Sequence, residues 1–243
     1  MSPYRMTLML LSMILTVPSV ANAHFPWLLV KNDQQGSSQV HLYLSESAAP
    51  DKPEYLKSLT GIPVFQIMEN STPLELKTTK GKDSLIATPI SHGNNPSAFV
   101  LSRTGRVMSR YGKDSLMKSY AKTYSMKGDW NKVDSSQQLA LDVVARRDGK
   151  NLTLKVLWNG IPASTENTEL TIKGPVFRDE ITAGEVSRIV AKVNDKGEFT
   201  LPLPKEGTLS IRASYNEPAE GEHEGKKYNN IRHNSTLALQ LSE

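Results

Sequence analysis

Short stretches in which apolar and polar residues alternate run through this chain. In residues 40–44, three aliphatic residues occupy every second position, and His41 and Tyr43 fall between them. Residues 152–158 and 237–241 repeat the pattern. A period of two is typical of a half-buried β-strand, so each stretch is predicted to be a strand with one face on a core. His41 and Tyr43 would then be exposed or covered by another layer.

Further strands are predicted in the first half of the chain, separated by Asn, Asp, Gly, Pro and Ser turn residues. They cover residues 62–68, 74–77 and 84–87. After Pro53, the residues Tyr55, Leu56 and Leu59 lie at helical spacing and are followed by Gly61, which predicts one or two helical turns. Short strands with turn signals about every 8 to 12 residues indicate an all-β sandwich.

Two segments have less direct signals. In residues 113–124, Leu116, Tyr120 and Tyr124 fit a helix, while the tyrosine content also suits a strand. Spacing leaves both structures open there. Residues 194–197 read Asn-Asp-Lys-Gly between two apolar stretches. This turn chemistry predicts a hairpin that joins the strand before it to the strand after it.

The predicted fold class is therefore all-β, with two β-sandwich modules of immunoglobulin-like or transthyretin-like type. Residues 125–138 are rich in Gly, Asp, Asn, Lys and Ser, and they form the best candidate boundary. We expect an N-terminal β module over residues 24–135 and a C-terminal β-sandwich over residues 136–243. Whether the two modules share one continuous sheet is left open by the sequence.

The N-terminus has the features of a secretory signal peptide, residues 1–23. Arg5 is followed by an apolar run over residues 6–17, and small residues stand at the predicted cleavage site, where Ala23 precedes His24. The run is shorter than the roughly 20 residues needed to cross a bilayer. We therefore expect a periplasmic or secreted protein with no membrane insertion after processing. Its mature chain would begin at His24.

Composition and motifs narrow the chemistry. The chain has no cysteine, which excludes disulfides and thiolate metal sites. Its formal charge of +4 falls by one when the signal peptide is removed, and basic and acidic residues are interspersed. That pattern predicts no nucleic-acid partner. Motifs for serine hydrolases, zinc proteases and phosphate-binding loops are also absent from the sequence, so no catalytic residue is assigned.

Two family resemblances follow from longer stretches of sequence. Residues 154–162, 194–201 and 207–213 resemble the repeat-B-like, transthyretin-like sandwich of bacterial surface proteins. Residues 24–27, 40–46, 120–124, 222–228 and 232–237 together resemble the exported domain-of-unknown-function family 4198. The second resemblance covers nearly the whole mature chain. It implies a periplasmic protein associated with nickel or cobalt uptake. This chain departs from the family pattern at Asn234, where an aromatic residue often follows the late histidine.

His24 is the leading candidate for metal binding. An N-terminal histidine offers its α-amine and its imidazole from one residue, which suits nickel, cobalt or copper. His41 and His233 are the leading candidates to complete such a site, although a buried His233 paired with a carboxylate or carbonyl is the commoner outcome. His223, among the glutamates of residues 220–224, is a further candidate ligand, although such a run is more often a solvated loop.

The sequence thus predicts an exported, non-enzymatic accessory protein that binds a divalent transition metal through His24. Its partners would be the metal ion and a membrane transport or surface partner. The alternative is a β-sandwich interaction module for a cell-surface glycan or a protein. An oxidative copper enzyme with an N-terminal histidine is a third hypothesis, and it needs a second histidine that the fold places beside the first.

Overall fold

The computed structural model describes residues 24–33, 35–90, 96–110, 112–125, 129–133, 138–174 and 187–241. The predicted signal peptide and residue 135, where the predicted modules meet, lie outside these ranges. The described residues form an all-β sandwich, as the alternating pattern predicts. No helix among them is long and apolar enough to cross a membrane.

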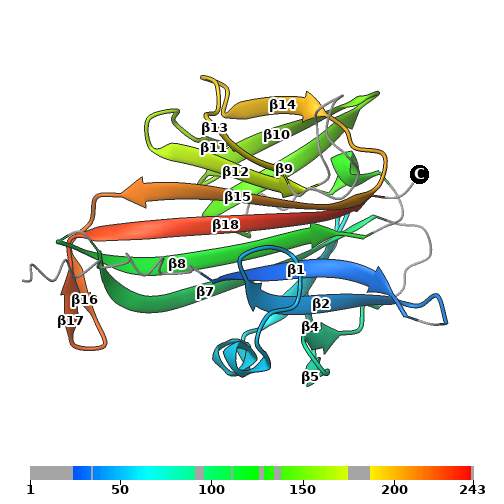
Figure 1. Cartoon of the computed structure of the whole chain (residues 1–243), viewed down its shortest axis with the longest axis horizontal. Helices are drawn as coiled ribbons and strands as arrows, with labels where there is room; N and C mark the ends of the chain where they lie inside the picture. The colour runs from blue at the N-terminus through cyan, green and yellow to red at the C-terminus, as the bar shows by residue number, and fades with distance from the viewer. Residues whose placement is uncertain are drawn as a thin grey trace, which may run out of the picture.

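A long central sheet organises the described part of the chain (Figure 1). It has eight strands in the order β13-β12-β15-β18-β8-β7-β3-β4. Their bounds are β3 Val64–Met68, β4 Leu74–Leu76, β7 Ser97–Arg110, β8 Lys113–Tyr124, β12 Thr168–Gly174, β13 Ser187–Ala191, β15 Gly207–Glu217 and β18 Asn230–Leu241. Neighbouring strands are antiparallel except β18 and β8, which are parallel. The two halves of the chain therefore share one sheet.

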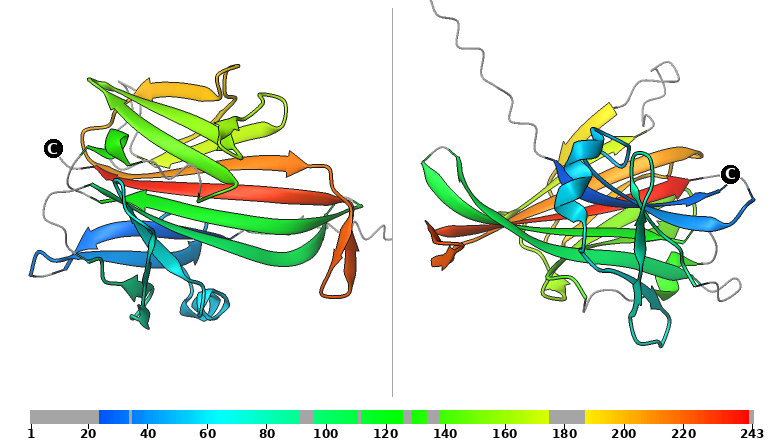
Figure 2. Two further views of the ribbon diagram at one scale, coloured as in Figure 1. Left: turned by 180° about the vertical axis from the view of Figure 1, so that it is seen from behind. Right: turned by 90° about the horizontal axis from the view of Figure 1, so that it is seen from below.

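Two smaller sheets pack on the central sheet, above and below its long strands in Figure 1 and seen from two further sides in Figure 2. The N-terminal sheet has the order β1-β2-β6-β5, and the C-terminal sheet has β11-β10-β14 with β9 paired to β10. Their bounds are β1 Phe25–Asn32, β2 Ser38–Ser45, β5 Thr78–Lys80, β6 Leu85–Ala87, β9 Leu141–Asp148, β10 Asn151–Trp158, β11 Ile161–Pro162 and β14 Glu198–Pro202. The remaining elements are the 3-10 helices η1 (Pro53–Leu59) and η2 (Trp130–Lys132) and the hairpin β16 (Gly221–His223) and β17 (Lys226–Tyr228).

Strand β18 is buried on both faces because the two smaller sheets cover opposite sides of it. Leu237 and Leu239 belong to the core shared with the C-terminal sheet. Ala238, between them, packs with Trp27 and Leu29 of the N-terminal sheet. Successive side chains of a strand point to opposite faces, so this one strand contributes to both cores.

The segment left open between helix and strand is the strand β8. Its last five residues are all buried, because β8 lies beside β18 under both smaller sheets. A strand that is buried on both faces loses the clean alternation of a half-buried strand. That loss explains why spacing alone did not separate the two interpretations.

The predicted hairpin at residues 194–197 is wrong. The strand before the turn, β13, pairs with β12 in the central sheet, whereas β14 after it pairs with β10 in the C-terminal sheet. The turn itself forms, since the amide of Gly197 donates a hydrogen bond of 2.8 Å to the carbonyl oxygen of Asn194. It transfers the chain from one sheet to the other, and turn residues carry no information on which sheet each flanking strand joins.

A fully buried ion pair joins the central sheet to the C-terminal sheet. Nζ of Lys122 in β8 contacts Oδ1 of Asp142 in β9, and both side chains are 0% exposed. Burial by itself lowers the pKa of Lys122, but attraction to Asp142 and Tyr124 outweighs that effect, so its pKa is raised overall. The lysine therefore keeps its charge inside the core, where the carboxylate compensates it.

We predict that Lys122→Met destabilises the fold by about 3–5 kcal/mol, because it leaves the charge of Asp142 uncompensated in the core. The double variant Lys122→Met/Asp142→Leu should recover most of that loss. Urea unfolding of the two variants and the parent protein measures both effects. The matched control is Lys155→Met, since Lys155 and Glu198 form a partly exposed pair at 3.7 Å. That change should cost less than about 1 kcal/mol. Equal losses for the two lysine variants would contradict the argument.

Candidate functional site

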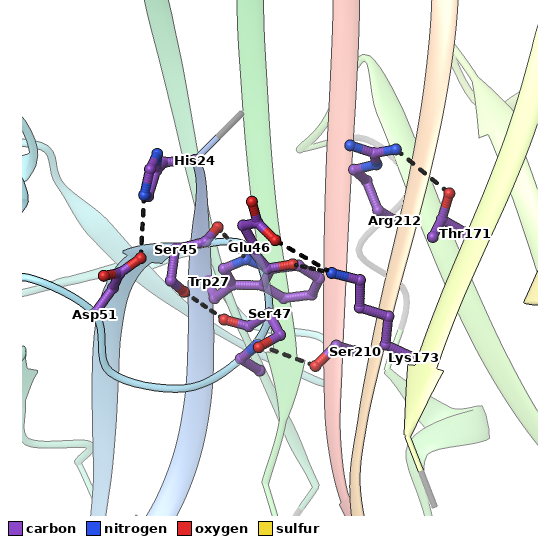
Figure 3. A network of polar contacts seen from close by, with 11 residues as sticks. His24, Trp27, Ser45, Glu46, Ser47, Asp51, Thr171, Lys173, Ser210 and Arg212 are labelled. Atoms are coloured by element: carbon purple, nitrogen blue, oxygen red, sulfur yellow. Dashed lines mark hydrogen bonds and ion pairs between the residues drawn. The ribbon is translucent and has the colours of Figure 1, made fainter. Parts of the chain in front are cut away.

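His24 directly precedes β1, and its side chain is held beside the loop that follows β2 (Figure 3). Its Nε2 lies 3.1 Å from Oδ2 of Asp51. Its ring packs against Tyr55 with the ring centroids 4.3 Å apart. The side chains of His24 and Asp51 are 19% and 33% exposed, so solvent reaches both. The imidazole is therefore oriented by its neighbours without being sealed from solvent.

Asp51 is itself held in place by the local backbone. Its Oδ1 accepts a hydrogen bond of 2.7 Å from the amide of Lys52. The 3-10 helix then begins at Pro53, whose fixed φ suits the first turn of a helix. The amide of Tyr55 donates to the carbonyl oxygen of Lys52 at 3.0 Å. The carboxylate and the tyrosine that contact His24 thus come from one short, internally bonded segment.

The start of β1 is also anchored to the strands around it. Nε1 of Trp27 donates to the carbonyl oxygen of Ser45 at 3.0 Å. The hydroxyl of Thr236 in β18 donates to the carbonyl oxygen of Pro26 at 2.6 Å. The ring of Phe25 lies under the guanidinium of Arg212, with 4.6 Å from Cζ to the ring centroid. These contacts fix the backbone next to His24, and so they fix where its α-nitrogen lies.

Charged side chains surround this end of β1 on the side of the central sheet (Figure 3). Nζ of Lys173 lies 3.8 Å from Oε2 of Glu46. Arg212 donates to Oγ1 of Thr171 at 3.3 Å. Burial lowers the pKa of Arg212, and repulsion from Arg232 lowers it further. Arginine remains protonated in proteins, so positive charge stands close to the first residues of β1.

His41 does not lie near His24. It pairs with Leu29 across the β1–β2 ladder, while Ser45 pairs with Phe25, the residue after His24. The two histidines are thus about five positions apart along the ladder, or roughly 16 Å. Nδ1 of His41 lies 3.0 Å from Oγ of Ser84. Burial lowers the pKa of His41, as does the charge of Lys31.

His233 points into the core on the other side of the central sheet, as its position in the last strand predicts. It is 2% exposed. Nδ1 lies 3.0 Å from the hydroxyl of Tyr120, and Nε2 lies 2.9 Å from Oε2 of Glu217. Trp158 contacts the ring edge-on, with centroids 4.5 Å apart. His24, at the start of β1, belongs to the opposite side of the sheet.

The contacts of His233 fix its protonation. Burial and the charge of Glu217 raise the pKa of Tyr120 to about 12, so its hydroxyl keeps a proton to donate to Nδ1. The Nε2–H then donates to Glu217. Burial lowers the pKa of His233 and outweighs the opposing effect of the hydrogen bond that its ring donates to Glu217. The ring is therefore held neutral, with each nitrogen already bonded within the fold.

His223 lies in the hairpin β16–β17, where it pairs with Lys226. This hairpin projects from the end of the central sheet near the start of β18 (Figure 1). Within the described ranges, no three His, Asp or Glu side chains come close enough together to hold a metal ion. The structure therefore gives His24, His41, His233 and His223 four separate environments. It brings none of the other three to His24.

Three features of these environments were not predicted from the sequence. Asp51 is 27 positions from His24, and no periodicity links a strand start to a loop residue. Burial of His233 beside a carboxylate was the commoner outcome expected from the sequence, but its partners Tyr120 and Glu217 were not identified, because they lie on two other strands that meet it only through the fold. Lys122 did carry a usable signal, because a lysine between Tyr120 and Tyr124 on a buried face requires a partner.

One solved structure similar to this chain is that of the chicken CNTN1 FN1-FN3 domains. The match has 11% sequence identity and a TM-score of 0.21, and it covers 90% of this chain and 66% of the other. This chain thus spans slightly less than two thirds of that structure. A TM-score this low does not establish a shared fold. No curated protein matches the sequence.

A family model matches residues 21–217, which include the start of β1, the loop with Asp51 and every strand of both smaller sheets. The matched range is more than half of the chain, and its description is a domain of unknown function, DUF4198. It ends at Glu217, the partner of His233, and leaves β18 outside. The chain therefore belongs to the DUF4198 family.

Proposed function

We propose that this DUF4198 protein is exported to the periplasm or secreted and binds nickel, cobalt or copper through His24. After removal of residues 1–23, the α-amine and Nδ1 of His24 would coordinate one ion and close a six-membered chelate ring. The protein would act as an accessory that carries the ion to a membrane transport or surface partner. No reaction is assigned to it.

The observation that carries this proposal is the contact between Nε2 of His24 and Asp51. Histidines that bind metals usually donate their second ring N–H to a carboxylate or a carbonyl, which fixes the tautomer and the ring orientation. Asp51 contacts the ring nitrogen that cannot close a chelate with the α-amine. The carboxylate thus favours the tautomer in which Nδ1 carries the lone pair.

The surroundings of His24 suit a carrier better than a permanent metal centre. The other three candidate histidines do not reach it, so the chain supplies two nitrogens from one residue. Water or groups of a partner protein would fill the remaining positions on the ion. Because the pair of His24 and Asp51 is partly exposed, a partner can reach the ion and exchange it.

The first prediction concerns the ligand atoms. Mature protein that begins at His24 should bind one equivalent of copper(II) or nickel(II) in a calorimetric titration, and His24→Ala should lose that binding. A protein whose α-amine at His24 is acetylated should also lose most of it, because the α-nitrogen then becomes an amide with no amine beside it. Mass spectrometry must confirm the first residue of each protein.

The matched control for that titration is His223→Ala, which removes a histidine from the hairpin β16–β17. It should leave the affinity unchanged. If the parent protein and His24→Ala bind equally well, His24 is not a ligand. Glycan-array or pull-down signals that survive a chelator would then favour a β-sandwich interaction module.

The second prediction concerns Asp51. Asp51→Asn should weaken metal binding by roughly 10- to 100-fold, because loss of the carboxylate removes the group that orients the ring. Glu54→Gln is the matched control, since Glu54 is an exposed carboxylate in the adjacent 3-10 helix. That variant should bind as the parent does. Equal weakening by the two variants would indicate an effect of net charge alone.

The third prediction concerns pH. Both nitrogens of His24 bind metal only when they are deprotonated, so protons compete with the ion. Lowering the pH from about 8 to about 6 should weaken binding by roughly tenfold or more. Titrations at several pH values measure the slope. The acetylated protein should show a shallower slope, because it has no α-amine to deprotonate.

A further inference from the structure

Asn234 is an unexplained buried amide in the central sheet. It lies in β18 and is 0% exposed. Within the described part of the chain, neither Oδ1 nor Nδ2 of Asn234 has a hydrogen-bond partner. A carboxamide offers two donor and two acceptor positions, and leaving such a group unmet inside a protein is costly. Within the described residues, both polar atoms of Asn234 are therefore available to a further polar partner.

Strand β1 packs across β18 from the neighbouring sheet, and two contacts relate positions along the two strands. Strands β1 and β18 run in the same direction in Figure 1. Thr236 bonds to the carbonyl oxygen of Pro26, and Ala238 packs with Trp27 and Leu29, so the two strands advance together. Continuing this correspondence by two residues along each strand brings Asn234 to the level of His24. Asn234 also shares the face of Thr236 and Ala238, because side chains alternate along a strand.

We propose that Oδ1 of Asn234 accepts a hydrogen bond from the α-amine of mature His24 and positions that amine for metal binding. The inference rests on the proposed function, because it needs a chain that begins at His24. A neutral amine has two N–H groups and one lone pair. One N–H is directed to Asn234, and the lone pair is directed to the ion. Asp51 orients the ring and Asn234 orients the amine, so each arm of the chelate has its own positioning residue.

Neighbouring polar groups on the same face do not fill this role. The hydroxyl of Thr236 already donates to Pro26. Asn230, on the same face four residues earlier, has its own partner, since its Nδ2 donates to Oγ of Ser115 at 3.3 Å. Asn230 therefore provides a matched control: the same residue type on the same strand and face, away from the N-terminus.

The test is a stability cycle on metal-free protein. Asn234→Leu is made in the protein that begins at His24 and in the protein with one added glycine before it. Leucine should lower Tm in the first background, where it removes an acceptor for the amine, and should be harmless or stabilising in the second. The effect of the substitution should differ by about 3 °C or more between the backgrounds. Asn230→Leu should show no such difference.

A second measurement does not depend on the folding of any Asn234 variant. The α-amine of the parent protein should be acylated more slowly than that of the Gly-extended protein, as followed by mass spectrometry of the N-terminal peptide. Equal acylation rates, or an equal effect of Asn234→Leu in both backgrounds, would overturn the role of Asn234.

The outcomes also separate this inference from the proposed function. Coupling between the amine and Asn234 without metal binding would support the hydrogen bond from the amine to Asn234 and refute the metal proposal. Metal binding without coupling would do the reverse. A mature chain that begins at another residue would refute both.

Discussion

The parallel ladder between β18 and β8 is the constraint on which the rest of the structure depends. It joins the strands of the two halves of the chain into one sheet and is covered on both faces. Burial on both faces requires a strand with few charges, yet β8 carries Lys122. The fold meets this requirement by pairing the lysine with Asp142 of the C-terminal sheet. Replacement by apolar residues of similar size is often neutral or stabilising for such pairs, so the pair is better regarded as a contribution to correct docking of the two sheets than as a source of stability.

The same ladder explains why the candidate histidines are kept apart. Alternation along β18 sends His233 towards Tyr120 and the C-terminal sheet, while Asn234 and Thr236 face β1. A shift of one residue in the register would exchange these two sets. The side chain that meets the start of β1 is therefore an amide and not an imidazole. Asn234 is accordingly the residue on this face that we propose as the partner of the amine of His24.

The sequence predicted the fold class because half-buried strands such as β2 and β10 keep a period of two. It failed where burial was of another kind. Residues 113–124 lacked the signal because both faces of β8 are covered, and the turn at Gly197 was read as a hairpin because turn chemistry is local. His24 was chosen as the candidate ligand because it follows the predicted cleavage site. Asp51 was not found, because 27 positions separate it from His24 and only tertiary packing brings the two residues together.

The proposed site has a consequence for where in the cell it can work. While residues 1–23 are attached, the α-nitrogen of His24 is an amide, whose lone pair is delocalised into the peptide bond. Such a nitrogen is a poor metal ligand near neutral pH, and the imidazole alone is a single donor. Cleavage creates the second donor without any change in the fold, since Thr236, Trp27 and Asp51 already hold the residue in place. Under the proposed function, metal binding is therefore coupled to export: the protein gains its chelate at the step that releases it into the compartment where the ion is carried.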